Sequence, residues 1–216
     1  MTDERRVDNP ETAGEIEIIG RTPAPAGQPY LVIGRTSNYK WLWSDERRAF
    51  PRNLLARVTV YQPEPQDPAY RVIGFYAQRG AGPPDGSTII VKSLNDPDGS
   101  LLKEPDDYVR IWTSEGSHCV FPGAIWRPVI TKHDNFVVMG HVATKGFDKP
   151  PLNAVRCVHN TQVQESRIAD KIYSDQGTHS QSDFTLYSVD GLSGVFVSQP
   201  NYDPPRLPTF RFKTVS

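Results

Sequence analysis

The sequence has little cysteine and no surplus of charge of one sign. Its two cysteines, Cys119 and Cys157, are too few for a disulfide scaffold, and in a reducing compartment they stay thiols. A bridge between them is the alternative that the sequence leaves open. The 24 basic and 25 acidic residues leave a net charge of -1, so the broad positive surface of a nucleic-acid-binding protein is missing.

Long apolar runs are absent as well. No run of about 18 apolar residues occurs, and no charged-then-apolar leader opens the chain, which argues against a transmembrane helix and a classical signal peptide. We therefore expect a cytoplasmic protein or one at the periphery of a membrane. No phosphate loop, nucleophile elbow or metal-ligand spacing occurs, so the sequence predicts no cofactor and no metal site.

Proline, glycine and strand-forming residues are plentiful. The 20 prolines and 16 glycines are spread evenly among Val, Ile, Tyr, Phe, Trp and Thr. This mixture is typical of many short strands separated by turns. The sequence therefore predicts an all-β fold.

Three markers recur in the same order. An aromatic residue followed by Ser or Thr occurs in WLWSD, RIWTSEG and KIYSDQG. Two strands follow each time, of which the second contains a glycine, at Gly74, Gly140 and Gly194. The segments PPDGSTIIVK, PPLNAVRCVH and PPRLPTFRFK then align without a gap. Three markers in one order predict an internal repeat.

We predict three repeat units, at about 41–97, 105–160 and 170–216, each of about four strands. The segments between the units are interpreted as connectors. Units this small should share one core around a pseudo-threefold axis, in a single domain at 14–216 that follows a flexible N-terminus at 1–13. The third unit is shortened, and we expect N-terminal strands within 14–40 to close its sheet.

The stretches LLKEPDDYVRIWTSEG, IWRPV and VVMGHVATKGFDKPPLNAVRCVH resemble the vacuolar protein sorting-associated protein 62 family. The resemblance is dense over about 41–163 and thinner in the third unit. It implies a β-prism-like domain without enzyme activity, an architecture also found in several sugar-binding lectins and as the targeting domain of some membrane-attack-type toxins. The lectin signature Gln-x-Asp-x-Asn-x-Val-x-Tyr does not occur here.

The repeated aromatic residues are interpreted as core. Trp43, Trp112 and Tyr173 occupy equivalent places and follow apolar neighbours, which favours packing over a ligand platform. The same holds for Tyr61, Trp126 and Tyr187. The polar residues that follow the first set lie in loops, where binding residues often occur. They are the candidate ligand-binding residues: Ser44, Asp45, Glu46, Thr113, Ser114, Glu115, Ser174, Asp175 and Gln176.

The alternative for these loops is an ordinary turn, in which Ser, Thr and Asp accept hydrogen bonds from their own backbone. The same alternative explains Asn95, Asp96 and Asp98, whose side chains are also of the type that binds calcium. Lys92, His159 and Lys213 share one repeat position and could contact membrane headgroups. Cys157 and His159 suggest a thiol nucleophile, but the other repeats carry unrelated residues at these places, so no catalytic residue is predicted.

Two functions follow. The first is a non-enzymatic recognition module that binds a glycan or a membrane headgroup through repeated loops, as the targeting part of a toxin-like or membrane-associated system. The alternative is an intracellular trafficking or scaffold protein that binds other proteins. A pore former is not expected, because no segment outside the repeats could supply a membrane-crossing strand pair. The oligomeric state stays open.

Overall fold

The fold is all-β. The computed structural model describes residues 16–45, 57–117, 119–178 and 180–215, and this part of the chain contains no α-helix. The fold class predicted from the sequence is therefore confirmed. The predicted flexible segment 1–13 lies outside the described residues.

The strands are short. In chain order they are β1 (Glu17–Arg21), β2 (Tyr30–Thr36), β3 (Tyr39–Ser44), β4 (Val58–Pro63), β5 (Arg71–Val72), β6 (Tyr76–Arg79), β7 (Thr88–Leu94), β8 (Leu102–Lys103), β9 (Asp107–Thr113), β10 (Gly123–Val129), β11 (Phe136–Val137), β12 (Val142–Lys145), β13 (Cys157–His159), β14 (Val163–Ser166), β15 (Ile168–Ser174), β16 (Thr185–Val189), β17 (Leu192–Gln199) and β18 (Thr209–Phe212). Two 3-10 turns, η2 (Leu152–Ala154) and η3 (Asn160–Gln162), flank β13.

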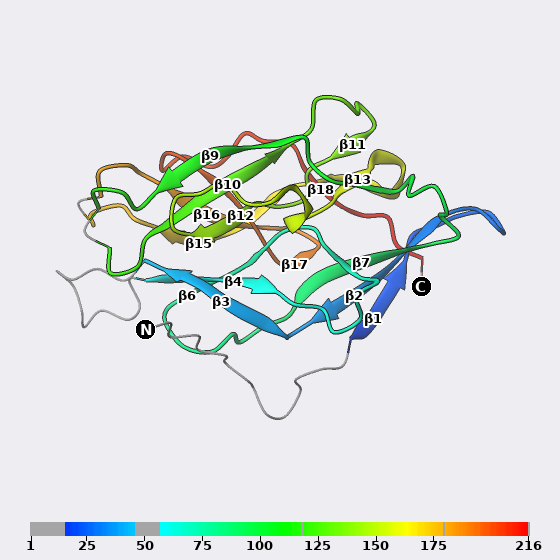
Figure 1. Ribbon diagram of the computed structural model, residues 1–216, viewed down its shortest axis with the longest axis horizontal. Coiled ribbons are helices and arrows are strands. Elements are labelled where there is room, and N and C mark those ends of the chain that lie inside the picture. The colour runs from blue at the N-terminus through cyan, green and yellow to red at the C-terminus, as the bar shows by residue number, and fades with distance from the viewer. Residues whose placement is uncertain (1–15, 46–56, 118, 179, 216) are drawn as a thin grey trace.

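The strands pair into several small antiparallel sheets. Three sheets have the orders β3-β4-β6, β9-β10-β12 and β15-β16-β17. The other three are β1-β2-β7-β5, β8-β13-β11 and β14-β18. Figure 1 shows the first set toward one end of the long axis and the second set toward the end where the C-terminus lies.

Two sequence-based expectations about the edges were wrong. β2 does not close the third sheet, because it pairs with β7 along its whole length, from Tyr30 opposite Leu94 to Thr36 opposite Thr88. β1 pairs with β2 and reaches the C-terminal segment at an isolated bridge between Arg21 and Val215. The segments interpreted as connectors contain β8 and β14, which pair with β13 and β18. The edge of the third unit is thus covered by β14, the strand that directly precedes β15.

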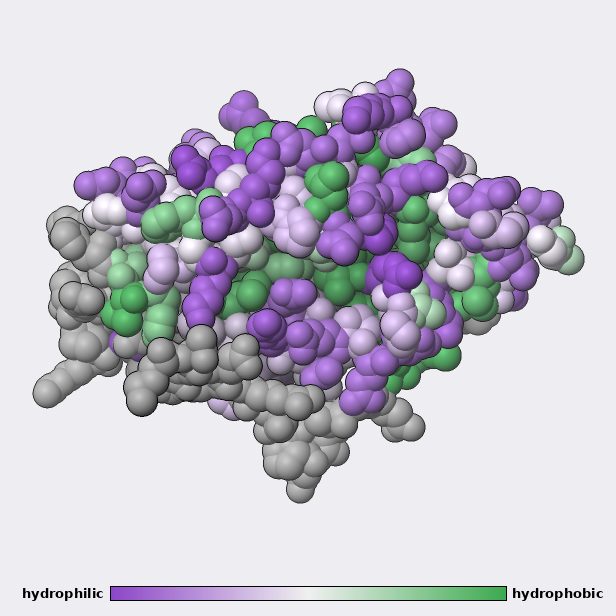
Figure 2. Space-filling model, in the orientation of Figure 1, coloured by the Kyte–Doolittle hydropathy of each residue, from purple (hydrophilic) through white to green (hydrophobic). Residues whose placement is uncertain are grey.

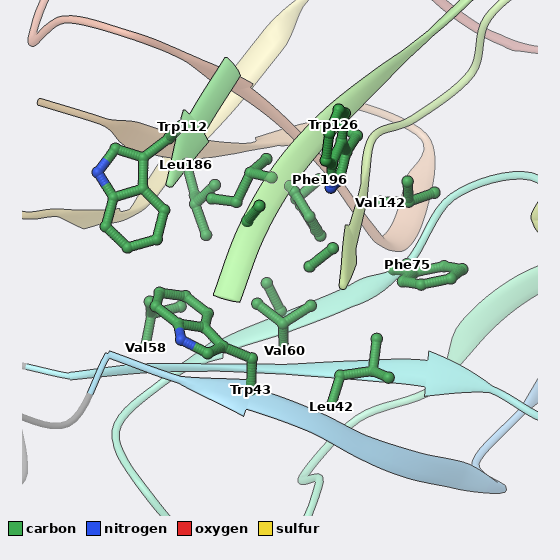
Figure 3. Packing of buried hydrophobic residues seen from close by; sticks show 14 of the residues in the cluster. Leu42, Trp43, Val58, Val60, Phe75, Trp112, Trp126, Val142, Leu186 and Phe196 are labelled. Atoms are coloured by element: carbon green, nitrogen blue, oxygen red, sulfur yellow. The ribbon is translucent and has the colours of Figure 1, made fainter. Parts of the chain in front are cut away.

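The repeated aromatic residues are buried, as predicted. Trp43, Trp112 and Tyr173 are at most 5% exposed and belong to one apolar cluster, in which Phe184 touches all three rings. Figure 3 shows Trp43 and Val60 from β3 and β4 facing Trp112 and Leu186 across this cluster. Tyr61, Trp126 and Tyr187 are also buried. Large aromatic side chains fill the space where the three sheets meet.

Three backbone segments that the sequence assigned to different units approach one another at the centre of the molecule. The Phe75 amide donates to the His141 carbonyl, and the His141 amide donates to the Phe196 carbonyl, both at 2.9 Å. A Cβ on Gly74 or Gly140 would lie within 2.6 Å of the Val195 Cγ1 atom, so glycine is required at both places. In the third unit Val195, and not Gly194, occupies this position, because Val142 and Val197 face equivalent partners on β10 and β16. The alignment on Gly194 was therefore wrong by one residue.

His141 lies at this centre and is almost completely buried. Its Nδ1 accepts a hydrogen bond of 2.9 Å from the Ser198 amide. Burial, together with the nearby charge of Arg127, lowers the pKa of His141 to about 3. The imidazole is therefore neutral throughout the physiological range.

Folding stability is expected to fall as the pH drops below about 6.5, because the unfolded chain then binds a proton at His141 that the folded chain excludes. The free energy of unfolding should decrease by about 1.4 kcal/mol per pH unit from this residue until the pH nears its folded pKa, and be unaffected by it above about pH 6.5. Urea unfolding at pH 7.5 and 5.0 measures this. The control is His141→Phe, because phenylalanine occurs at the corresponding place in the first unit, as Phe75. Between pH 7.5 and 5.0 the free energy of unfolding of this variant should fall by about 2 kcal/mol less than that of the original protein. An equal loss in both proteins would contradict the prediction.

Candidate binding loops

The candidate residues begin where equivalent strands end. β3, β9 and β15 end at Ser44, Thr113 and Ser174, and the next amide in each case bonds to the strand that follows. Asp45 donates to the Val58 carbonyl at 3.0 Å, Ser114 to Gly123 at 2.9 Å and Asp175 to Phe184 at 3.3 Å. The three loops therefore start with the same backbone geometry.

The side chains at the same three positions point inward. Asp45, Ser114 and Asp175 are at most 5% exposed. Ser114 Oγ accepts from the Gly123 amide and Asp175 Oδ1 from the Phe184 amide, both at 2.9 Å. These residues fix the bases of their loops, since a buried polar group that lost its partner would destabilise the fold.

Asp45 joins three distant parts of the chain. Its Oδ2 accepts a hydrogen bond from the Tyr173 hydroxyl, and its Oδ1 accepts one of 3.2 Å from the Cys119 thiol. Both cysteines are free thiols. Sequence analysis did not identify Cys119 as a contact of Asp45, because 74 residues separate them and the pairing has no counterpart in a short motif.

Indole groups connect the loops further. Trp43 Nε1 donates to the Phe121 carbonyl and Trp112 Nε1 to the Ser182 carbonyl, both at 2.9 Å. The Ser117 and Ser180 hydroxyls lie 3.1 Å apart. The end of β3 thus meets the loops that follow β9 and β15 at one end of the molecule, the end away from β1 and β7 in Figure 1.

Each candidate residue can now be placed. Glu115 and Gln176 are exposed, Thr113 and Ser174 are partly buried, Ser44 is buried like Asp45, and Glu46 lies outside the described residues. The Glu115 amide donates to Thr113 Oγ1 at 3.3 Å and the Gln176 amide to Ser174 Oγ at 3.2 Å. These are the ordinary turn contacts of the alternative interpretation. Ligand binding by the exposed residues stays a prediction.

The three basic residues do not form one cluster. Lys92 lies 3.5 Å from the Asp67 carboxyl group and over the Tyr70 ring. His159 and Lys213 meet at Thr161, through its hydroxyl at 2.8 Å and its carbonyl at 2.9 Å. The structure therefore brings together two of the three, and headgroup contact by them stays a prediction.

Cys157 and Asp96, two further residues considered from the sequence, have structural surroundings. Burial raises the pKa of the Cys157 thiol to about 12, so it stays protonated at neutral pH and is a poor nucleophile. The Asp96 carboxyl group accepts from the amides of Ser100 and Leu101, as a turn requires. No cluster of three potential metal ligands and no membrane-spanning helix was found among the described residues.

Hydrophobic residues also reach the surface away from the loops. Figure 2 shows them in a band across the middle of the face, flanked by polar residues. A groove of about 700 Å³ along β4, β5 and β12 has Leu42, Phe75 and Ala143 in its lining. Charged residues surround it, and two of them are paired, Lys149 with Asp107 and Arg156 with Glu104.

Comparison with known proteins identifies the family. The family model of vacuolar protein sorting-associated protein 62 matches residues 30–195, more than half of the chain. The chain belongs to this family. The resemblance seen over about 41–163 is thus confirmed and extends further toward both ends. A comparison with curated proteins gives no match.

One solved structure shares the fold of this member of the vacuolar protein sorting-associated protein 62 family. It is GNIP1Aa from Chromobacterium piscinae, with a TM-score of 0.63 and 22% sequence identity, over 84% of this chain and 37% of that chain. The chain thus spans little more than a third of GNIP1Aa. At this identity the likeness supports the fold alone, and it agrees with the β-prism-like domain that the family resemblance implies.

Proposed function

We propose that the chain is a non-enzymatic recognition module whose loop end binds a glycan or a membrane headgroup. The observation that supports it most is the convergence of the ends of β3, β9 and β15 at one end of a β-scaffold. Rigid scaffolds commonly carry binding residues in such loops. Several weak contacts of similar loops would add to a useful affinity.

The proposal includes a single β-prism-like domain of three pseudo-threefold repeats. Its support is the repeated pairing: β4, β10 and β16 are each the middle strand of a three-stranded sheet, and β7, β13 and β18 each pair with the strand that precedes their own unit. The third repeat is shorter because Val189 pairs with Leu192 across a tight turn at Asp190 and Gly191, where the other repeats insert β5 and β11.

The exposed loop residues Glu115 and Gln176 are the proposed ligand contacts, since the buried members of the set already have partners within the protein. An amide and a carboxylate side chain can hydrogen-bond to sugar hydroxyl groups. The segment 46–56, which connects β3 to β4, contains Arg47, Arg48 and Arg52 in its sequence. Arginine favours anionic headgroups, so both ligand classes belong in the test.

Binding should be measured on a glycan array and on liposomes of defined headgroup composition, with and without calcium. We expect saturable binding to one class, weakened about tenfold by Glu115→Ala with Gln176→Ala, which corresponds to about 1.4 kcal/mol. The matched control is Gln164→Ala with Glu165→Ala, the same two residue types exposed on β14. The control variant should bind like the original protein.

Binding that the two variants weaken equally would contradict the placement of the site. Absence of binding to every glycan and liposome would contradict the recognition of these ligands and favour the alternative, a trafficking or scaffold protein that binds other proteins. A role as the targeting part of a toxin-like or membrane-associated system follows only if liposome binding is found.

A further inference from the structure

A second groove, away from the binding loops, is lined mostly by apolar residues. It has a volume of about 350 Å³ and lies along β10, β11 and the chain that leads into β18. Its walls include Ile130, Phe136, Val137, Leu207 and Phe210. Small-molecule sites are commonly apolar pockets of about this size or larger with a few polar groups.

The groove corresponds in the repeat to the larger groove beside β4. Pro128 and Pro63 occupy equivalent places, opposite Tyr108 and Tyr39, and each lines its own groove. The larger groove has six charged residues in its lining, of both signs. The smaller one has a single charged residue, Arg127, besides the neutral His141. The two grooves therefore occupy corresponding places, but the smaller one has far fewer charged residues in its lining.

His141 offers a hydrogen-bond donor in this groove. Its Nδ1 must accept, because its partner is the Ser198 amide. A neutral imidazole with an accepting Nδ1 carries its hydrogen on Nε2. Within the described part of the chain no side chain or carbonyl accepts from this N–H, and His141 lines the groove.

Arg127 adds a positive charge beside this donor. It is partly buried, lines the groove, and forms no ion pair with a residue in the described part of the chain. Arg127 and His141 line the same groove. An unpaired, partly desolvated guanidinium group is a strong site for a carboxylate or a phosphate.

We propose that this groove binds an acidic amphiphile, such as a fatty acid or an acidic lipid. The carboxylate or phosphate group accepts from Arg127 and from the Nε2–H group of His141. The hydrocarbon chain lies against Phe136, Val137 and Phe210. This site is separate from the loop end and stands whether or not the loops bind a glycan or headgroup.

The test is titration with decanoate, followed by calorimetry and by the ¹³C-methyl signal of methionine. Met139 lines the groove, and the only other methionine is Met1, so one signal reports on the site. We expect saturable binding that shifts the Met139 signal. Decanol, which lacks the charge, should bind at least about tenfold more weakly.

Arg127→Gln should weaken decanoate binding at least about tenfold and leave decanol binding unchanged. The matched control is Arg110→Gln, an exposed arginine on the neighbouring strand β9 that does not line the groove. It should bind decanoate like the original protein. Phe210→Ala should weaken both ligands. No shift at Met139, equal affinity for decanol and decanoate, or an equal effect of both arginine variants would overturn the proposal.

Vesicles distinguish the source of the ligand. Displacement of decanoate by vesicles that contain phosphatidic acid, but not by neutral vesicles, would support the proposal with a membrane lipid as the ligand. Decanoate binding that vesicles leave unchanged would support it with a free acid as the ligand.

Discussion

Replacement of Asp45 by alanine is expected to lower the free energy of unfolding by about 3 kcal/mol. The carboxyl group is 1% exposed and accepts hydrogen bonds from Tyr173 and Cys119. Its removal leaves the buried Tyr173 hydroxyl without this acceptor and opens space at the seam of three units. Urea unfolding followed by tryptophan fluorescence measures the loss.

Two controls show whether Asp45 stabilises the fold through its hydrogen bonds or through its charge. Asp98→Ala changes an exposed aspartate in a turn and should cost less than about 0.5 kcal/mol. Asp45→Asn keeps one acceptor oxygen and should be less destabilising than Asp45→Ala. A loss below about 1 kcal/mol for Asp45→Ala would contradict a structural role. A loss of ligand binding in this variant would then point to direct contact with the ligand.

Gly140→Ala is expected to destabilise the fold by about 3 kcal/mol, through overpacking at the centre. The added methyl group would lie 2.2 Å from Val195 Cγ1 and 3.1 Å from Gly74 Cα, and the second of these is backbone that cannot move aside alone. The measurement is again the free energy of unfolding, because the substitution removes no hydrogen bond.

A double-mutant cycle with Val195→Ala tests the cause. The single Val195→Ala change should cost about 1–2 kcal/mol, because it leaves a small cavity. In the double variant the closest clash is gone, so the two losses should combine to at least about 1 kcal/mol less than their sum. If the two losses of unfolding free energy simply added, the clash with Val195 would not be the cause of the loss in Gly140→Ala.

The core residues were predictable from the sequence, because large aromatic side chains at matched positions are expected to be buried together in one core. Trp43, Trp112 and Tyr173 satisfied this expectation. The glycine match at Gly194 failed because strand pairing brings Val195, one residue later, beside Gly74 and Gly140. A one-residue shift turns every side chain of a strand to the other face, but Val195, Phe196 and Val197 are all apolar, so periodicity could not reveal it here.

The edges and the loops were harder to predict. A two-residue strand such as β8 has no periodicity of its own, and only its pairing with β13 identifies it. β2 pairs with β7 and not with a strand of the third sheet. This choice depends on packing between residues far apart in the sequence. For the loops, sequence placed Asp45 after an aromatic strand, but its burial depends on Tyr173, which is 128 residues away.

The side-chain hydrogen bonds at the loop end form a closed circuit. Trp43 bonds forward to Phe121, Trp112 bonds forward to Ser182, and Tyr173 bonds back to Asp45. In a linear array of repeats the outermost members contact one neighbour only, and unfolding can begin there. A circuit has no outermost member, so opening one loop deprives both of its neighbours of a contact. We therefore expect the amides at the ends of β3, β9 and β15 to exchange their hydrogens together, at a rate set by the opening of the whole end.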